Sequence, residues 1–188
     1  MFRDDIEKSF DVLNRGGVIL YPTDTVWGIG CDATNSAAVE HIYTIKRRNE
    51  ARSMLTLVDS FDMLAKYVQD IPDIAKKLHE EAVKPLSIIY PGAKNLAVNL
   101  IADDNSIGVR IVRDTFCQQL IKVFGKPIVS TSANISGKPA PGIFDEISKE
   151  IREAVDYVVR WRQDDRHHAT ASSIIKVNVD GTYTVLRS

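Results

Sequence analysis

Four polar segments of this 188-residue chain follow apolar runs and carry side chains suited to a small polar or anionic ligand. The first is Tyr21-Pro22-Thr23-Asp24-Thr25-Val26-Trp27-Gly28, where two hydroxyls and a carboxylate follow a short β-branched run. These groups could hold a small polar ligand. Thr and Asp also bond to local backbone in ordinary turns, and this segment alone favours such a capped turn.

The second segment, Lys46-Arg47-Arg48-Asn49-Glu50-Ala51-Arg52-Ser53, has the densest cluster of cations in the chain. Arginine offers a planar fork of donors and lysine a point charge, and both suit phosphate oxygens. Cations in the last turn of a helix also interact favourably with the helix dipole while they stay in water. The segment therefore fits phosphate binding and a solvated helix end about equally well.

An arginine stands inside an apolar strand in the third segment, Ser106-Ile107-Gly108-Val109-Arg110-Ile111-Val112-Arg113. Strand alternation places Arg110 on the same face as Gly108 and Val112. Burying a charge is costly unless it is paired, so Arg110 requires an anion. That anion is either a ligand or a structural Asp or Glu of the chain itself.

The fourth segment, Ser130-Thr131-Ser132-Ala133-Asn134-Ile135-Ser136-Gly137, follows the apolar run Pro127-Ile128-Val129. Its hydroxyls, amide and backbone N–H groups suit a nucleotide or an amino acid, although a plain polar loop has the same composition. All four segments come where strands end, and ligands of open α/β sheets bind at such ends. The chain has neither a Walker loop nor a Rossmann fingerprint.

The elements that must position these segments alternate between helices and strands. Apolar spacing and capping residues predict helices over 4–15, 37–45, 60–67, 72–82, 116–124 and 145–154. Short apolar runs predict strands over 18–21, 54–58, 86–90, 96–101, 107–112, 127–129, 157–160, 172–177 and 182–186. Asp180-Gly181 indicates a hairpin, and the neighbouring strands 96–101 and 107–112 require another antiparallel pair. We expect one α/β domain over 1–188, with a twisted sheet of parallel and antiparallel strands and flanking helices.

The composition excludes several classes of protein. Lys and Arg number 24 against 25 Asp and Glu, a formal net charge of −1, which excludes a binder of nucleic acid whose whole domain is cationic. Cys31 and Cys117 are too few for a disulfide framework and suit two small buried residues. The histidines lack metal-ligand spacing, so we expect no protein-built metal site. A charged N-terminus and the lack of a long apolar run predict a cytoplasmic protein without a membrane segment.

Taken together and in order, these residues resemble the YrdC/TsaC family, the threonylcarbamoyl-AMP synthases. The resemblance covers nearly the whole chain. It rests on Tyr21–Gly28 with Gly30-Cys31-Asp32, Lys46-x-Arg48, Gly108-Val109-Arg110, Lys126–Gly137, Ser172-Ser173-Ile174-Ile175 and the closing Val185-Leu186-Arg187. It implies a YrdC-like fold, a twisted mixed sheet with helices around a deep concave site.

The resemblance also implies a reaction in which L-threonine, bicarbonate and ATP give threonylcarbamoyl-AMP and pyrophosphate. The amine of threonine forms a carbamate with bicarbonate, and the carbamate oxygen then attacks the α-phosphate. Such a transfer depends on positioning and charge stabilisation. Mg²⁺ is implied on the phosphates of ATP, with few protein ligands. A separate transferase complex then modifies the adenosine next to the anticodon of certain tRNAs, and direct contact with tRNA or double-stranded RNA is a secondary expectation.

Carried over onto matching positions, the resemblance implies roles for individual residues. Thr25, Arg110 and Ser130 would hold threonine, with Arg110 clamping its carboxylate. Lys46, Arg48 and Arg52 would face the triphosphate, and Lys46, Arg48 and Arg110 would form the catalytic set. The nucleotide would contact Ser106, Ser132, Asn134 and Ser172.

Four single positions and one short segment depart from the family pattern. Arg47 stands where Gly is frequent, Arg52 where Lys or Asn is usual, and Leu57 where some members have His. Tyr90-Pro91-Gly92-Ala93-Lys94-Asn95 replaces the more usual Trp-Pro-Gly-Pro-x-Thr, and Ala140 replaces a Ser that often contacts the nucleotide.

Two other functions compete with the synthase. A YrdC-like RNA-binding or ribosome-maturation factor without synthase activity would bind RNA on a cationic surface. That surface would combine the second segment, Lys46–Ser53, with Arg113, Lys122 and Lys126. A related subgroup without the synthase pattern tends to lack the Ser132–Gly137 stretch, so its presence here favours the synthase. A carbamoyltransferase related to hydrogenase-maturation factors would carry further domains with Cys-rich zinc motifs, which this sequence lacks.

Overall fold

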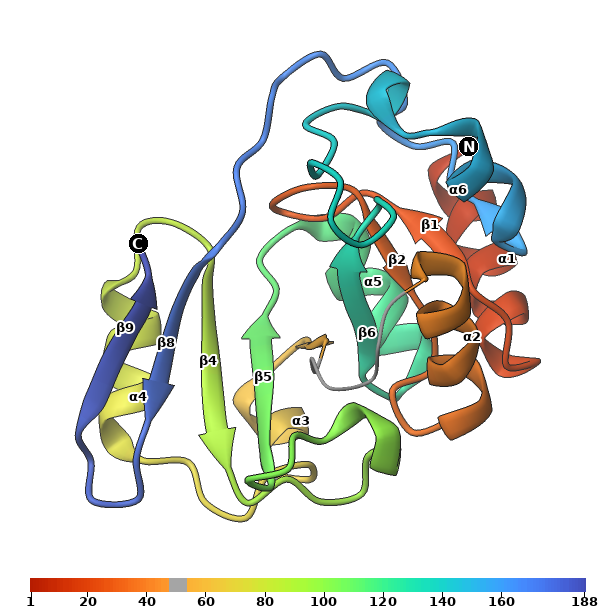
Figure 1. Ribbon diagram of the computed structural model, residues 1–188. Helices are drawn as coiled ribbons and strands as arrows, with labels where there is room; N and C mark the ends of the chain where they lie inside the picture. Colours follow the sequence, from red (N-terminus) through yellow and green to blue (C-terminus); the bar gives the residue numbers. More distant parts are fainter. Residues whose placement is uncertain (48–53) are drawn as a thin grey trace.

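The computed structural model describes residues 1–47 and 54–188. Within them, nine strands form one sheet in the order β7-β1-β2-β6-β3-β5-β4-β8-β9 (Figure 1). The strands are β1 (Ile19–Tyr21), β2 (Gly28–Gly30), β3 (Leu55–Val58), β4 (Leu86–Pro91), β5 (Ser106–Ile111), β6 (Ile128–Ser132), β7 (Tyr157–Val158), β8 (Ser173–Val177) and β9 (Tyr183–Arg187).

Parallel and antiparallel pairs are mixed in this sheet, as the sequence predicts. The pairs β1–β7, β3–β5 and β4–β8 are parallel, and β1–β2, β2–β6, β3–β6, β4–β5 and β8–β9 are antiparallel. The hairpin predicted at Asp180-Gly181 joins β8 to β9, and Gly181 has the positive φ of 81° that suits such a turn. The α/β class with a mixed sheet is therefore confirmed.

The helices are α1 (Phe2–Asn14), α2 (Ser36–Lys46), α3 (Phe61–Leu64), α4 (Asp73–Glu81), α5 (Thr115–Phe124) and α6 (Lys149–Ala154), with 3-10 turns η1 (Val98–Leu100) and η2 (Phe144–Glu146). Side-chain caps start several of them. Asn35 accepts from the backbone N–H groups of Ala37 and Ala38 at the start of α2, and Asp114 accepts from that of Cys117 at the start of α5. Helix α1 packs on α5, where the rings of Phe2 and Phe116 meet edge to face.

The prediction of a strand over 96–101 is wrong. These residues contain the 3-10 turn η1, and Leu96, Ala97 and Leu100 are buried, a spacing that suits a helical turn rather than a strand. The side chain of Asn99 also donates to the carbonyl of Ser36, at the first residue of α2. The antiparallel partner of β5 is β4 instead.

Strand β2 is absent from the sequence prediction because two of its three residues are glycines, which are poor strand formers. The structure explains why a glycine is present at position 30. A Cβ atom built on Gly30 would lie 2.4 Å from the carbonyl oxygen of Val129 and 2.7 Å from the ring of Tyr21. Only glycine lets β2 pass so close to its neighbours in the sheet.

Gly30→Ala is therefore expected to lower the free energy of unfolding by about 2–3 kcal/mol, within the range for overpacked cores. Urea denaturation measures this. Gly108→Ala is the matched control, because the one close contact of its Cβ would be with the end of the Leu55 side chain, at 2.6 Å, and that side chain can move. A smaller loss at position 108 is expected, and equal losses at both positions would contradict the close approach at Gly30.

A long connection, residues 159–172, runs from β7 to β8 across the top of the molecule in Figure 1 and contains only a turn at 161–164. We call it the 159–172 segment. Both cysteines are free and buried, as predicted. Among the described residues, no helix combines the length and the apolar character needed to cross a membrane.

Candidate functional site

The largest gathering of predicted site residues lies in a cavity of about 270 Å³. Thr25, Arg110, Ser130, Ser132 and Ser172 all line it, although they come from four separate parts of the chain. The rest of the lining comprises Val26, Gly28, Met54, Leu55, Thr131, Ala140, Ala171, Ile174 and Arg187. Strands β2, β3, β5, β6, β8 and β9 and the loops beside them carry these residues, so the site forms where the sheet brings distant segments together.

The loop between β1 and β2, residues 22–27, is organised by the hydroxyl of Thr23. Thr23 Oγ1 donates to the carbonyl of Val26 at 2.9 Å and accepts from the backbone N–H of Thr25 at 3.0 Å. It also lies 3.0 Å from Thr25 Oγ1. With the Thr23 proton directed to the Val26 carbonyl, Thr25 donates to Thr23. Arg110 Nη2 also donates to Thr23 Oγ1, at 3.5 Å. The lone pairs of Thr25 Oγ1 then remain to accept a hydrogen bond in the cavity.

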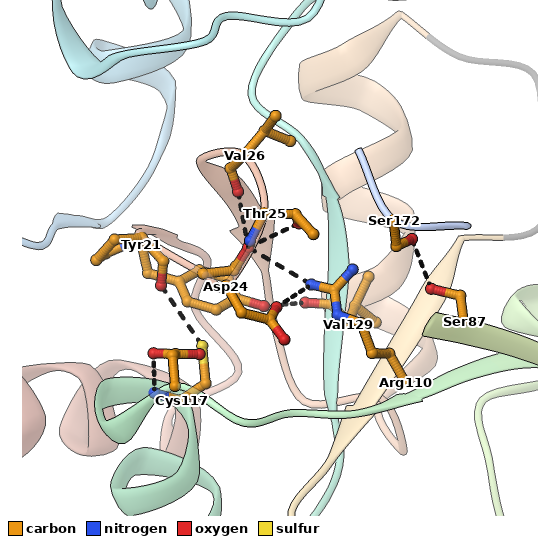
Figure 2. A network of polar contacts seen from close by, with 12 residues as sticks. Tyr21, Asp24, Thr25, Val26, Ser87, Arg110, Cys117, Val129 and Ser172 are labelled. Carbon is orange, nitrogen blue, oxygen red and sulfur yellow. Dashed lines mark hydrogen bonds and ion pairs between the residues drawn. The ribbon is translucent and has the colours of Figure 1, made fainter. Parts of the chain in front are cut away.

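Arg110 is 3% exposed and pairs with Asp24, whose carboxylate oxygen lies 3.1 Å from its Nη2. The sequence leaves open whether the anion beside Arg110 is a ligand or an acid of the chain itself, and Asp24 is such an acid. The Nε of Arg110 is buried and has no hydrogen-bond partner among the described residues. Figure 2 shows the guanidinium between Asp24 on one side and Ser172 on the other. Asp24 and Thr23 therefore hold Nη2, and Nε is left as a donor for a ligand.

Behind this pair lies a buried polar region that does not face the cavity. Burial raises the pKa of the Asp114 carboxyl, and the nearby Asp24 raises it further. Burial also raises the pKa of the Cys117 thiol, with Asp114 adding to the effect. Cys117 is thus a protonated thiol at neutral pH, and it donates to the carbonyl of Pro22. Its role is to support the 22–27 loop, since a nucleophile would need a thiolate.

Lys46 ends α2 and is buried under the residues that follow β6. Its ammonium donates to the carbonyl oxygens of Ser132 at 2.5 Å and Asn134 at 2.7 Å. Its own carbonyl accepts from the backbone N–H of Ser136. Ser132 Oγ donates to the side-chain oxygen of Asn134 at 2.5 Å. Lys46 therefore ties α2 to the Ser132–Asn134 turn, and its predicted contact with phosphate stays a prediction.

Ser172 and Arg187 form the far wall of the cavity. The hydroxyls of Ser172 and Ser87 lie 2.8 Å apart, and Figure 2 shows the two side chains pointing toward each other. Arg187 Nε donates to the carbonyl of Ser172 at 2.9 Å. This bond fixes a cation from β9 at the cavity.

Three predicted residues are not brought to this cavity. Asn134 lies beside it, in a neighbouring hollow with Ile135 and Lys138. Ser106 begins β5, four residues before Arg110, and its hydroxyl donates to Asp104 at 2.5 Å. Lys46 lies behind the Ser132–Asn134 turn. The nucleotide contacts predicted for these residues stay predictions, and Arg48 and Arg52 lie outside the described residues.

Two residues of this site have no predicted role. Asp24 stands inside the first polar segment, and a buried arginine that needs an anion is the signal that could have identified it. Arg187 closes the resemblance to the synthases, but nothing local distinguishes it from any exposed arginine at a strand end. Its place depends on the β8–β9 hairpin, which brings it to Ser172.

The structure shows where three of the residues that depart from the family pattern lie. Arg47 ends α2 with a φ of 49°, the left-handed conformation that glycine adopts without strain. The guanidinium of Arg47 pairs with Glu150 at 2.5 Å. Ala140 lines the cavity, and Leu57 is buried opposite Arg110 in the β3–β5 register. Leu57 is not among the described lining residues, so only Ala140 changes the cavity wall, which lacks the hydroxyl that a Ser would add.

The site can bind an anion and a polar group side by side. Among its described lining residues, Arg110 and Arg187 are cations, no Asp or Glu occurs, and hydroxyls face the space between them. Such a set stabilises developing negative charge and orients neutral donors and acceptors. The lining residues that the structure describes include no His, Cys, Asp or Glu to act as a base or to activate a hydroxyl, and what they offer is positioning and charge stabilisation.

Comparison with known proteins places these residues in one family. Residues 11–188 match the family model Sua5/YciO/YrdC, which is described as telomere recombination. A protein named threonylcarbamoyl-AMP synthase from Pseudoalteromonas translucida is 35% identical, over 82% of this chain and 84% of that one. A protein of the same name from Escherichia coli K12 is 30% identical, over 83% and 84%.

Solved structures show the same fold. The P. abyssi Sua5 protein in complex with L-threonine has a TM-score of 0.85 and 23% identity, covering 97% of this chain and 53% of that one. The chain thus spans about half the length of Sua5. E. coli YciO has a TM-score of 0.85 and 23% identity, covering 100% and 90%. A full-length HypF structure has a TM-score of 0.81 and 19% identity, covering 97% of this chain and 28% of that one.

Proposed function

This chain belongs to the Sua5/YciO/YrdC family, and from that premise we propose that it is a threonylcarbamoyl-AMP synthase. It converts L-threonine, bicarbonate and ATP into threonylcarbamoyl-AMP and pyrophosphate. Relatives that carry this name match more than four-fifths of the chain. The observation that carries the proposal is the buried Arg110 at a cavity wall together with Thr25 and Ser130.

Threonine is bound between Arg110 and the 22–27 loop. The guanidinium receives the α-carboxylate on donors that Asp24 does not use, as suits an arginine fork. Thr25 Oγ1 accepts from a donor of the substrate, and Ser130 lies on the adjacent strand β6. This placement holds the amino group toward the open cavity, where it forms the carbamate with bicarbonate and releases water.

The carbamate oxygen then attacks the α-phosphorus of ATP, and pyrophosphate leaves. The chain contributes orientation and positive charge to this step. Ser132 and Ser172 line the same cavity and contact the nucleotide, with Asn134 holding Ser132 in place. Lys46 and two of the three arginines of the segment Lys46–Ser53, Arg48 and Arg52, act on the triphosphate, and Ser106 contacts the nucleotide from β5.

Mg²⁺ enters with ATP, and it neutralises charge on the phosphates when bound. The described residues contain no cluster of three or more His, Cys, Asp or Glu side chains suited to a metal ion. The described lining of the cavity is also free of carboxylates. In this proposal phosphate oxygens and water hold the ion, because Mg²⁺ keeps several of its waters when it binds with a nucleotide.

The RNA-binding alternative is not supported by the relatives, which are named as synthases. Two cations of the expected RNA surface are also engaged within the protein. Arg113 donates to the carbonyls of His79 and Ala82 at the end of α4, at 2.6 and 2.7 Å. Lys126 pairs with Asp32 at 2.7 Å. A surface built on these residues would have to give up contacts that stabilise the fold.

The product serves tRNA modification in the cytoplasm, through a separate transferase complex that takes the threonylcarbamoyl group. Direct contact with tRNA or double-stranded RNA is a secondary part of the proposal. The chain as a whole has no net positive charge that would attract the phosphates of RNA, because its formal charge is −1.

The proposal is tested by measuring pyrophosphate release from MgATP with the purified chain. Release that requires both L-threonine and bicarbonate supports the synthase. Release that is equally fast without threonine, or none under any combination, would move the function to the RNA-binding class. A filter-binding assay with tRNA then tests that class directly.

A further inference from the structure

Arg162 links the 159–172 segment to the loop that binds threonine in the proposed function. Its Nη1 donates to the backbone carbonyl of Thr23 at 3.1 Å, across 139 residues of sequence. On its other side, Nε and Nη2 donate to one oxygen of Asp165 at 3.2 and 3.0 Å. The guanidinium is thus held in one plane and aimed at the loop. No sequence signal marks this arginine.

The backbone of Arg162 is in an unfavourable conformation. Its φ is 65°, in the left-handed region that residues other than glycine seldom adopt. Such conformations persist where the surrounding structure requires them, and they cluster at functional sites. At position 162 the conformation turns the chain just after Trp161, whose backbone N–H donates to the buried Asp5 at 2.8 Å. The turn directs the arginine side chain to Thr23.

The carbonyl that Arg162 holds belongs to the residue that organises the 22–27 loop. Thr23 sets the positions of Thr25 and Val26 through its hydroxyl, and both line the cavity. Further along, the 159–172 segment supplies Ala171 and Ser172 to the same cavity. The 159–172 segment therefore contributes to the cavity in two ways. Its C-terminal residues line the cavity, and Arg162 near its start holds the 22–27 loop, which forms another part of the cavity wall.

We propose that Arg162 is a positioning residue for the part of the cavity that binds the amino acid, between Arg110 and the 22–27 loop. It acts by holding this loop against the 159–172 segment. This inference rests on the proposed function only for the identity of the amino acid. Arg162 does not line the cavity and contacts no substrate. Its loss lets Thr25 and Asp24 move, and through Asp24 the guanidinium of Arg110.

Arg162→Gly tests the inference without a penalty at the backbone, because glycine adopts a φ of 65° freely. We expect the KM for threonine to rise about tenfold, the size expected when one charge-assisted hydrogen bond is lost. The kcat and the KM for ATP stay within about twofold. Amide hydrogen exchange in 22–27 becomes faster, even without substrates. Arg162→Lys keeps a donor and recovers part of the threonine KM.

Arg166→Gly is the matched control, since Arg166 lies in the same segment and pairs with the exposed Asp145. It is expected to leave both KM values unchanged. The inference is overturned if Arg162→Gly leaves the threonine KM within twofold of wild type, if both KM values rise alike, or if Arg166→Gly has the same effect. Should the wild-type chain show no threonine-dependent turnover, the proposed function fails; unchanged amide exchange in 22–27 would still overturn the inference separately.

Discussion

Arg110→Lys is expected to lower kcat/KM for threonine roughly 100-fold while ATP affinity stays unchanged. Lysine keeps a positive charge beside Asp24, but it loses the planar fork that binds a carboxylate through two parallel hydrogen bonds. The expected loss matches the removal of a donor aimed at substrate charge in an enzyme site. Initial rates of pyrophosphate release at varied threonine, with calorimetry for ATP, measure the two quantities.

Lysine is a better replacement here than alanine because of Asp24. Asp24 is 10% exposed, and its partner is Arg110. Arg110→Ala would leave this carboxylate buried without a counter-ion, which costs about 3–5 kcal/mol and confounds activity with folding. Arg113→Lys is the control, since Arg113 follows β5 and is bonded to the end of α4. Wild-type kcat/KM in Arg110→Lys would remove Arg110 from the threonine site.

The second large effect is expected at Lys46. Lys46→Met removes the ammonium that bonds the carbonyls of Ser132 and Asn134, leaving buried acceptors without their charged donor. Two such losses lower the free energy of unfolding by about 2–4 kcal/mol. For a chain of this length the Tm then falls on the order of 10 °C. Turnover falls as well, because the turn that carries Ser132 is no longer fixed.

Differential scanning calorimetry and ATP titration separate the two roles of Lys46. Lys138→Met is the matched control, because Lys138 is exposed and its hydrogen bonds to the loop use only its backbone. Its Tm and turnover are expected to match wild type. An unchanged Tm in Lys46→Met, with weakened ATP binding, would contradict the anchoring role and favour direct contact with phosphate.

The sequence predicts the fold well where local pattern and long-range pairing agree. The apolar runs at 18–21, 54–58 and 107–112 are strands, and Asp180-Gly181 is a hairpin turn. The run at 96–101 misleads because its burial comes from packing beside α2, which no local pattern reveals. Strand β2 is not predicted because glycines have low strand propensity. Gly30 is needed there because β2 passes very close to Tyr21 and Val129 of the neighbouring strands.

The site is predictable in its residue types and less so in its connections. A buried arginine in a strand requires an anion, and this follows from charge burial alone. Which anion it meets depends on the fold, because Asp24 lies 86 residues away and reaches Arg110 only across the sheet. The same holds for Arg162 and Arg187, whose contacts with Thr23 and Ser172 depend on the path of the 159–172 segment and on the β8–β9 hairpin.

The central claim is that the cavity joins threonine, bicarbonate and ATP in one product. Isotope-labelled bicarbonate, incubated with the chain, MgATP and L-threonine, tests this most directly when the products are separated and weighed by mass spectrometry. The predicted result is a labelled adenylate that contains threonine and forms together with pyrophosphate, and that disappears when threonine is left out. Pyrophosphate without label in an adenylate, or an unlabelled threonyl-adenylate, would contradict the claim.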